Sequence, residues 1–115
     1  MEMVLKKAAD IHTEPLEDIG EGKLNIVDVV AQPEGAPYSG GICEIWHAAP
    51  IVFEYDHDGS VCYMIEGEIE LEEDGVKKSF EPGDVVYIPK KEGLKVAFHT
   101  PSWGKFFFVS YPHWR

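Results

Sequence analysis

The sequence predicts a single all-β domain, built as a sandwich or barrel of short strands. Short runs rich in β-branched and aromatic residues recur along most of the chain, and glycine-containing turns separate them. The length of 115 residues is that of one domain. Helical patterning is confined to residues 6–19, where Pro15 interrupts it, so little or no helix is expected.

The first strand is expected at residues 23–30, which are rich in valine and isoleucine. Residues 32–41 contain two prolines and three glycines and are expected to form a loop. The dipeptide Asp74-Gly75 lies between two strand-like runs and predicts a tight hairpin turn. The remaining strands are expected at residues 42–48, 51–57, 60–73, 76–80, 84–88, 94–99 and 105–111.

Composition excludes several kinds of partner. The chain has 10 Lys and Arg against 21 Asp and Glu, a formal net charge of −11. An acidic surface repels nucleic-acid phosphates and anionic lipids, so we expect no nucleic-acid and no membrane partner. Two cysteines, Cys43 and Cys62, are too few for a disulfide scaffold, and we expect free thiols. No signal-peptide or membrane-spanning pattern is found, so a cytoplasmic location is expected.

Two stretches resemble the motifs of the cupin superfamily. Residues 62–67, CYMIEG, resemble the end of the first cupin motif, and residues 83–89, GDVVYIP, resemble the start of the second. The 15 residues between Gly67 and Gly83 match a minimal one-barrel cupin. Residues 106–114 resemble the close of the EutQ-like ethanolamine-utilisation cupins. The Cys62-Tyr63 element is shared with ureidoglycine aminohydrolase-like cupins.

This resemblance covers residues 40–114 and implies an RmlC-like jelly-roll barrel, a double-stranded β-helix. We therefore expect the barrel at residues 40–115, with strands and a loop of residues 1–39 packed on it as part of one domain. Residues 1–39 carry no motif of their own.

Cupins that bind a metal use two histidines, a glutamate and a later histidine as its ligands. The resemblance implies that other residue types occupy these four positions here. Counting from Gly67 puts Ser60 at the glutamate position. The histidine pair falls on Phe53 and Tyr55, or on Glu54 and Asp56 in a shorter spacing, and the last histidine falls on Leu94 or Val96.

Strand alternation favours the aromatic pair. Residues 51, 53, 55 and 57 form one face, and residues 52, 54, 56 and 58 form the other. The apolar face should point into the barrel, so Phe53 and Tyr55 are expected inside and Glu54, Asp56 and Asp58 outside. We therefore expect no metal cofactor; a slip of one residue would turn the carboxylates inward.

The barrel interior is the usual place for a small ligand, and seven residues are candidates for binding one. They are Trp46, His47, Phe53, Tyr55, His57, Ser60 and Cys62. His57 continues the inward phase of Tyr55, although an exposed turn histidine is an equal alternative. Cys62 needs no role beyond filling the core. Alternation does not decide which of Trp46 and His47 points inward.

Three functions remain open. The first is a metal-free cupin that binds a small metabolite, in an EutQ-like accessory role in amine or ethanolamine metabolism. The acetate kinase-like activity attributed to that family would need a nucleotide and Mg²⁺ site, which the sequence does not reveal. The second is a lyase or isomerase using Tyr55 and His57 as acid and base.

The third is a metal-dependent enzyme with the atypical ligands Glu54, Asp56, His57 and His99. Catalytic residues cannot be assigned from spacing alone. Residues 106–108 are all phenylalanine and put apolar side chains on both strand faces, so we also expect a homodimer.

Overall fold

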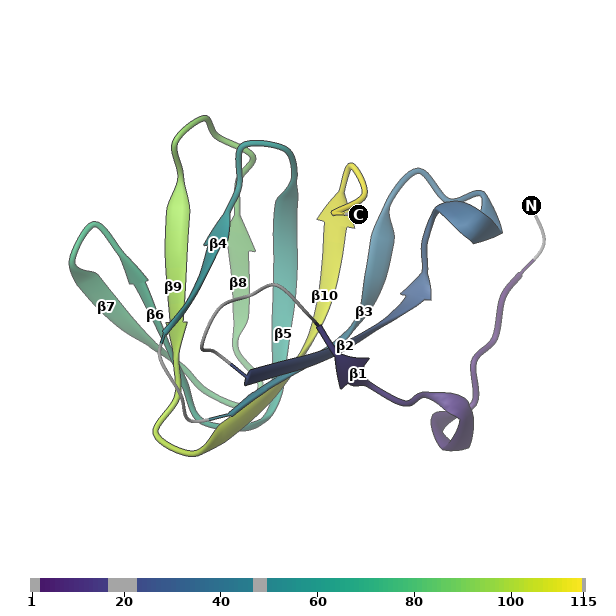
Figure 1. The fold of residues 1–115 in the computed structure, drawn as a ribbon, viewed down its shortest axis with the longest axis horizontal. Coiled ribbons are helices and arrows are strands. Elements are labelled where there is room, and N and C mark those ends of the chain that lie inside the picture. Colours follow the sequence, from purple (N-terminus) through teal and green to yellow (C-terminus); the bar gives the residue numbers. More distant parts are fainter. Residues whose placement is uncertain (1–2, 17–22, 47–49, 115) are drawn as a thin grey trace.

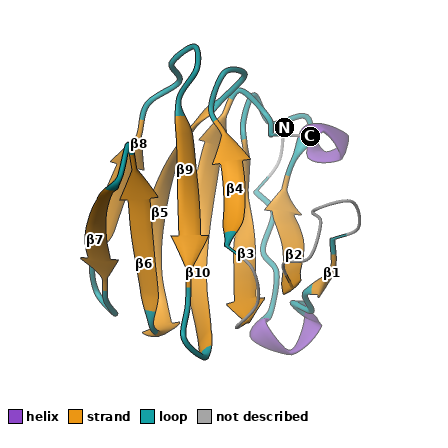
Figure 2. Cartoon of the chain, turned by 60° about the vertical axis from the view of Figure 1, so that its left-hand side comes forward, coloured by secondary structure: helices purple, strands orange, loops and turns teal. Residues whose placement is uncertain are grey.

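A computed structural model of the 115-residue chain describes residues 3–16, 23–46 and 50–114. Its strands form two antiparallel sheets, which Figures 1 and 2 show. The six-stranded sheet runs in the order β1 (Glu14–Pro15), β2 (Lys23–Val30), β3 (Ser39–Trp46), β10 (Trp103–Tyr111), β5 (Gly59–Gly67) and β8 (Val85–Ile88). The four-stranded sheet runs β4 (Ile51–Glu54), β9 (Lys95–His99), β6 (Ile69–Glu73) and β7 (Val76–Phe80). The all-β prediction is confirmed.

Helical structure in the described residues is limited to two single 3₁₀ turns, η1 (Ala8–Asp10) and η2 (Gln32–Glu34). The first of them falls in the segment where the sequence allows a helical turn. No helix among the described residues is long and apolar enough to cross a membrane.

The N-terminal strands extend the six-stranded sheet. β2 pairs with β3 along its length, and β1 pairs with β2. The loop expected at residues 32–41 is shorter than predicted, because β3 already begins at Ser39. Gly41 tolerates no side chain there, since a Cβ on it would lie 1.8 Å from the Val27 carbonyl oxygen of β2.

The strand expected at residues 60–73 is two strands in different sheets. β5 ends at Gly67 and β6 begins at Ile69, so the chain crosses from one sheet to the other at this point. Gly67 has a φ of +89°, and a Cβ on it would meet the Trp103 carbonyl oxygen at 2.3 Å. Only glycine fits this crossing, which the apolar-Glu-Gly motif marks in the sequence.

The Asp74-Gly75 hairpin is confirmed. Both residues have positive φ, 50° and 79°, and Glu73 pairs with Val76 across the turn. Two central residues of positive φ are typical of the turns that match the twist of paired strands.

The core lies between the sheets and is aromatic at its centre. Phe98 of β9 contacts Phe106 of β10 with ring centroids 5.5 Å apart, and Phe80 lies 6.4 Å from Phe106. Met64 and Ile45 are almost completely buried beside them. This packing leaves one part of the interior unfilled, and that part is the candidate site.

Candidate functional site

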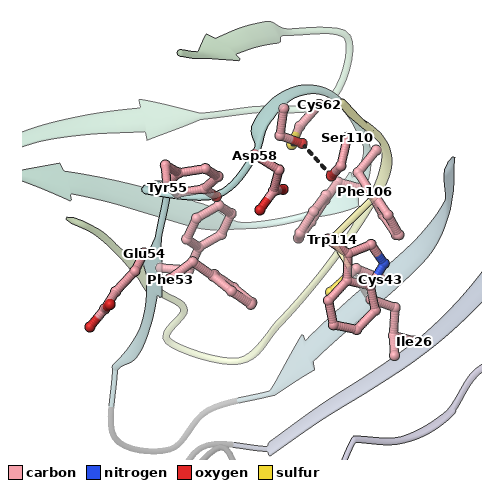
Figure 3. A pocket seen from close by; sticks show the side chains of 13 residues that line it. Ile26, Cys43, Phe53, Glu54, Tyr55, Asp58, Cys62, Phe106, Ser110 and Trp114 are labelled. Atoms are coloured by element: carbon pink, nitrogen blue, oxygen red, sulfur yellow. Dashed lines mark hydrogen bonds between the residues drawn. The ribbon is translucent and has the colours of Figure 1, made fainter. Parts of the chain in front are cut away.

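A cavity of about 150 Å³ lies in the barrel interior between the two sheets. Its walls come from β2, β3, β4, β5, β9 and β10, together with the turn after β4 and the C-terminal segment. The lining residues are Ile26, Cys43, Phe53, Glu54, Tyr55, Asp58, Ser60, Cys62, Phe98, Phe106, Phe108, Ser110 and Trp114 (Figure 3).

The predicted phase of β4 is confirmed through Tyr55. Phe53 is half-buried and Tyr55 is buried, and both line the cavity, while Glu54 and Asp56 are exposed. Glu54 touches the cavity at its edge, but its carboxylate turns away in Figure 3 and lies 3.8 Å from the Lys95 ammonium. Asp56 accepts a hydrogen bond of 2.6 Å from the Gly93 backbone N–H. The one-residue slip that would bring both carboxylates inward is therefore absent.

The phase breaks beyond Tyr55, where strand alternation places His57 and Asp58 on the wrong sides. β4 ends at Glu54, and the chain then turns toward β5, so strict alternation no longer applies. His57 is exposed and does not line the cavity, so the exposed turn histidine, and not the inward one, is the alternative that the structure shows. Asp58, expected to face water, is 8% exposed and lines it. Tyr55 therefore shares the cavity with a carboxyl group instead of an imidazole.

The residues at the cupin metal positions are not of the types that cupins use as metal ligands. Phe53, Tyr55 and Ser60 line the cavity, whereas Leu94 and Val96 are buried outside it. Phe98 lies beside Phe53, and the two rings pack edge to face with their centroids 5.2 Å apart. Phenyl rings, a phenol and a hydroxyl are poor ligands for the metals that cupins hold.

No group of three or more His, Cys, Asp or Glu side chains that could hold a metal occurs in the described part of the chain. The atypical set proposed from the sequence is dispersed. His99 lies 2.7 Å from a Glu72 carboxylate oxygen on the four-stranded sheet, and Asp56 and His57 are exposed in the turn after β4. These residues do not meet at one point of the cavity.

A short series of polar side chains crosses the cavity wall from the turn to β5. Asp58 lies near the Ser110 side chain, which favours its charged form. The Ser110 hydroxyl donates to Ser60 Oγ at 3.5 Å, and Ser60 Oγ lies 3.5 Å from Cys62 Sγ. Figure 3 shows Asp58 between Tyr55 and Ser110. These groups give an otherwise aromatic cavity one polar side.

Burial determines the protonation of the cavity groups. Desolvation raises the pKa of Asp58 above its ordinary value, while the nearby Ser110 side chain and His57 oppose that shift. Burial and the nearby Cys62 and Asp58 raise the pKa of Tyr55, so the phenol stays protonated at neutral pH.

Both thiols are free, as predicted, and neither is activated. Burial raises the pKa of Cys62 to about 11 and also raises the pKa of Cys43. The two cysteines lie on β5 and β3, which flank β10 on opposite sides, so two strand spacings separate them. That separation of about 10 Å is too long for a disulfide.

Of the remaining candidates, Trp46 is half-buried at the end of β3 and does not line the cavity. Its ring lies under the Lys23 ammonium, 5.0 Å from the centroid. His47 lies outside the described residues. Of the seven predicted ligand-binding residues, the structure thus brings Phe53, Tyr55, Ser60 and Cys62 together.

Comparison with known proteins identifies the family. The family model described as "Ethanolamine utilisation protein EutQ" matches residues 6–115. The chain belongs to the EutQ family. The match also corrects the extent of the resemblance seen in the sequence, since it begins well before residue 40 and includes the N-terminal strands.

Two EutQ relatives are named acetate kinases. The protein of Salmonella typhimurium is 28% identical over 95 residues, which are 80% of this chain and 39% of the relative. The protein of Clostridioides difficile is 38% identical over 50 residues, 44% of this chain and 31% of the relative. The chain therefore spans less than two-fifths of the length of these curated relatives.

Solved structures agree on the fold. A crystal structure of an ethanolamine utilisation protein Q from Salmonella typhimurium superposes with a TM-score of 0.80 at 21% identity, covering 92% of this chain and 83% of that one. The EutQ protein of Clostridioides difficile gives 0.79 at 23% identity, covering 93% and 78%. An ectoine synthase from P. lautus gives 0.79 at 19% identity, covering 96% and 79%. The cupin fold expected from the two motifs is confirmed.

Several cavity residues of this EutQ-family cupin were not selected from the sequence as binding residues. Trp114 closes the cavity beside Phe108, with ring centroids 6.4 Å apart. Its indole N–H donates to Asp28 at 2.7 Å, and its backbone N–H donates to Ser39 Oγ at 3.2 Å. Asp58 and Ser110 were missed because their positions depend on a turn and on strand pairing. The aromatic C-terminus was the available signal for Trp114.

Proposed function

We propose that this EutQ-family cupin binds a small metabolite in its barrel cavity, without a metal, in an accessory role in amine metabolism. The observation that carries the proposal is the cavity itself, which combines an aromatic wall with one polar side formed by Asp58, Ser60 and Ser110. Concave apolar pockets with a few converging polar groups are the usual sites for small molecules. The family description supplies the metabolic context.

The metal-free part of the proposal is supported by the donor types at the cupin metal positions. Phe53, Tyr55 and Ser60 offer no imidazole or carboxylate. The Asp58 carboxyl is the one acidic group directed into the cavity among the described residues, and a single carboxylate does not hold a transition metal tightly.

The acetate kinase named for the relatives is not what we propose for this cavity. Phosphoryl transfer depends on cationic groups that hold the phosphates. The cavity lining has no Lys, Arg or His among the described residues. The matched segments cover only 39% and 31% of the two curated relatives, so the activity of those proteins can reside in parts that have no counterpart here.

A cytoplasmic location is part of the proposal. Cys43 and Cys62 are both free. Reducing compartments keep thiols in that state.

The proposal also includes a homodimer. The outer face of the six-stranded sheet exposes a patch of large apolar side chains, namely Val61, Tyr63, Ile65, Val85, Tyr87 and Phe107. They are neighbours by strand pairing, since Tyr63 lies opposite both Phe107 and Val85. Exposed apolar patches of this kind mark protein contacts, and a second copy of the same sheet is the partner that we propose.

The binding proposal is tested by ligand-observed NMR on the purified protein in the presence of a chelator. The test uses a set of small amines, carboxylates and polyols. We expect at least one compound to bind to the wild-type protein. The same compound should not bind to Ser60→Met, because the longer methionine side chain fills the polar side of the cavity. Ser110→Met serves as a second filling variant if Ser60→Met does not fold.

Binding that disappears with the chelator would overturn the metal-free proposal, as would a stoichiometric transition metal in elemental analysis. Absence of binding by every compound, or equal binding by wild type and both filling variants, would overturn the assignment of the cavity as the binding site.

A further inference from the structure

We infer that the cavity selects a small organic ammonium ion, with Asp58 as its counter-ion. The inference rests on the proposed binding function and deepens it by naming the chemical class of the ligand.

The charge of the lining is negative. Asp58 is directed into the cavity and is 8% exposed, and no Lys, Arg or His lines the cavity in the described part of the chain. The second acid of the lining, Glu54, is turned to the outside and lies near Lys95. An anionic ligand would therefore meet a buried carboxyl group without a compensating cation, which is costly, whereas a cation would provide that compensation.

The walls suit a cation as well. Six aromatic side chains among the described residues line the cavity. They are Phe53, Tyr55, Phe98, Phe106, Phe108 and Trp114. Phe53 and Phe98 meet edge to face at 5.2 Å, so their ring faces are not stacked on each other. Aromatic faces attract alkylammonium groups, and aromatic enclosures are a recurring means of binding them.

The hydroxyl groups complete the polar side. Ser60 and Ser110 lie 3.5 Å apart, which is long for a hydroxyl hydrogen bond, and Ser110 also contacts Asp58. Both hydroxyls can turn to donate to or accept from a ligand N–H or O–H group. A ligand bearing an ammonium and a hydroxyl group would satisfy Asp58 and a serine together.

The volume limits the ligand to a small molecule. A cavity of about 150 Å³ accommodates roughly four to eight non-hydrogen atoms, since a dry cavity of that size holds a molecule such as benzene. Nucleotides and sugar phosphates are too large.

The titration of Asp58 gives the inference a pH signature. The other titratable groups near Asp58 are Tyr55 on the strand side, Cys62 and Cys43 across the cavity, and His57 beside it in the turn. Tyr55 and both thiols remain protonated through neutral pH because burial raises their pKa values. Burial also raises the pKa of Asp58 in the empty cavity, so acid removes the counter-ion and weakens cation binding.

Calorimetric titration of the full chain with matched probes tests the inference. The probes are ethanolamine and choline as cations, ethylene glycol and 3,3-dimethylbutan-1-ol as their neutral counterparts, and acetate as an anion. At about pH 7.5, where ethanolamine is protonated and choline is permanently charged, we expect the cations to bind about tenfold or more tightly than their neutral counterparts. Acetate should not bind measurably.

Asp58→Asn should remove the preference for each cation over its neutral counterpart. Asp74→Asn is the matched control, because it makes the same chemical change at the exposed hairpin turn, where asparagine also fits. Should Asp58→Asn not fold, wild-type titrations at falling pH provide the same test, since cation affinity should fall and neutral-probe affinity should not.

Neutral probes or acetate that bind as tightly as the cations would overturn the inference and leave the proposed binding function intact. A cation preference that is equally strong in Asp58→Asn would also overturn it. If none of the probes binds and the wider set of small compounds does, the inference again fails alone; if neither binds, the proposed function fails with it.

Discussion

The two faces of β5 depart from the usual distribution of side chains in a sheet. Ser60 and Cys62 point into the barrel, while Val61, Tyr63 and Ile65 of the same strand point outward and are 37–48% exposed. A half-buried antiparallel strand normally places its apolar residues inside and its polar residues outside. The inner side of β5 gives up apolar burial at Ser60, although Cys62 and Met64 are buried there, and its outer side leaves large apolar side chains in water.

The four-stranded sheet shows the normal arrangement. Its outer side carries the ion pairs Lys77–Glu70 and Lys95–Glu54 and the His99–Glu72 contact. Its inner side presents Phe98, Leu71 and Ile69, all buried. The difference is consistent with our proposals for the six-stranded sheet, a ligand on its inner side and a second copy of the chain on its outer side.

The largest expected effect is a loss of stability that differs between the inward and outward faces of β10. Phe106→Ala removes an inward ring that contacts Phe98 and Phe80, and should lower the free energy of unfolding by about 3–5 kcal/mol. This loss should be the same at all protein concentrations. Phe107→Ala, on the outward face, should cost less and should do so in a concentration-dependent way, because it weakens association.

Urea unfolding at several protein concentrations measures both variants. Equal, concentration-independent losses for Phe106→Ala and Phe107→Ala would show that the two faces do not differ as described.

The next effect concerns the outer face alone. Tyr63→Glu puts a charge at the centre of the apolar patch and should convert the proposed dimer into a monomer of 12.9 kDa. Ser79→Glu is the control, since it adds the same charge to an exposed position of β7 in the four-stranded sheet. Light scattering after size-exclusion chromatography measures the mass. A monomeric wild type, or a dimer that persists in Tyr63→Glu, would contradict the proposal.

The smallest effect concerns the inner face. Burial raises the pKa of Asp58 above 3.8, so the folded state holds this proton more tightly than the unfolded state. The stabilisation from this group is therefore present at low pH and is lost as the pH rises through the folded-state pKa. Asp58→Asn lacks this dependence and should unfold a few degrees higher than wild type near neutral pH, with the difference shrinking in acid.

Thermal unfolding across the pH range, with Asp74→Asn as the control for net charge, measures this difference. A variant that unfolds at a lower temperature than wild type at neutral pH would show that Asp58 stabilises the fold, and would weaken its interpretation as a group kept for binding.

Most of the architecture was predictable because its determinants are local. Residues 23–30 and 76–80 form strands with the predicted bounds, and the Asp74-Gly75 turn follows from two residues that accept positive φ. The inward phase of Phe53 and Tyr55 followed from alternation within one strand. The single strand expected at residues 60–73 was wrong, because the crossing at Gly67 depends on the close approach of Trp103, which lies far away in the sequence.

The candidate site was half predictable for the same reason. Ser60 and Cys62 share the register of β5, and they line the cavity as expected. Asp58 and His57 were assigned to the wrong sides, since the strand ends at Glu54 and a turn obeys no period of two. Ser110 reaches Ser60 only through the pairing of β10 with β5, 50 residues apart in sequence.

The residues that replace the cupin metal ligands were thus determined by the sequence alone, because a count from a glycine motif along one strand needs no knowledge of its neighbours. Which side chains surround these positions was decided by the tertiary structure. The turn after β4, the pairing of β10 with β5 and the closing Trp114 bring one carboxyl group, two hydroxyls and an aromatic wall together. These groups come from separate segments, and only the packing of two sheets brings them to one cavity.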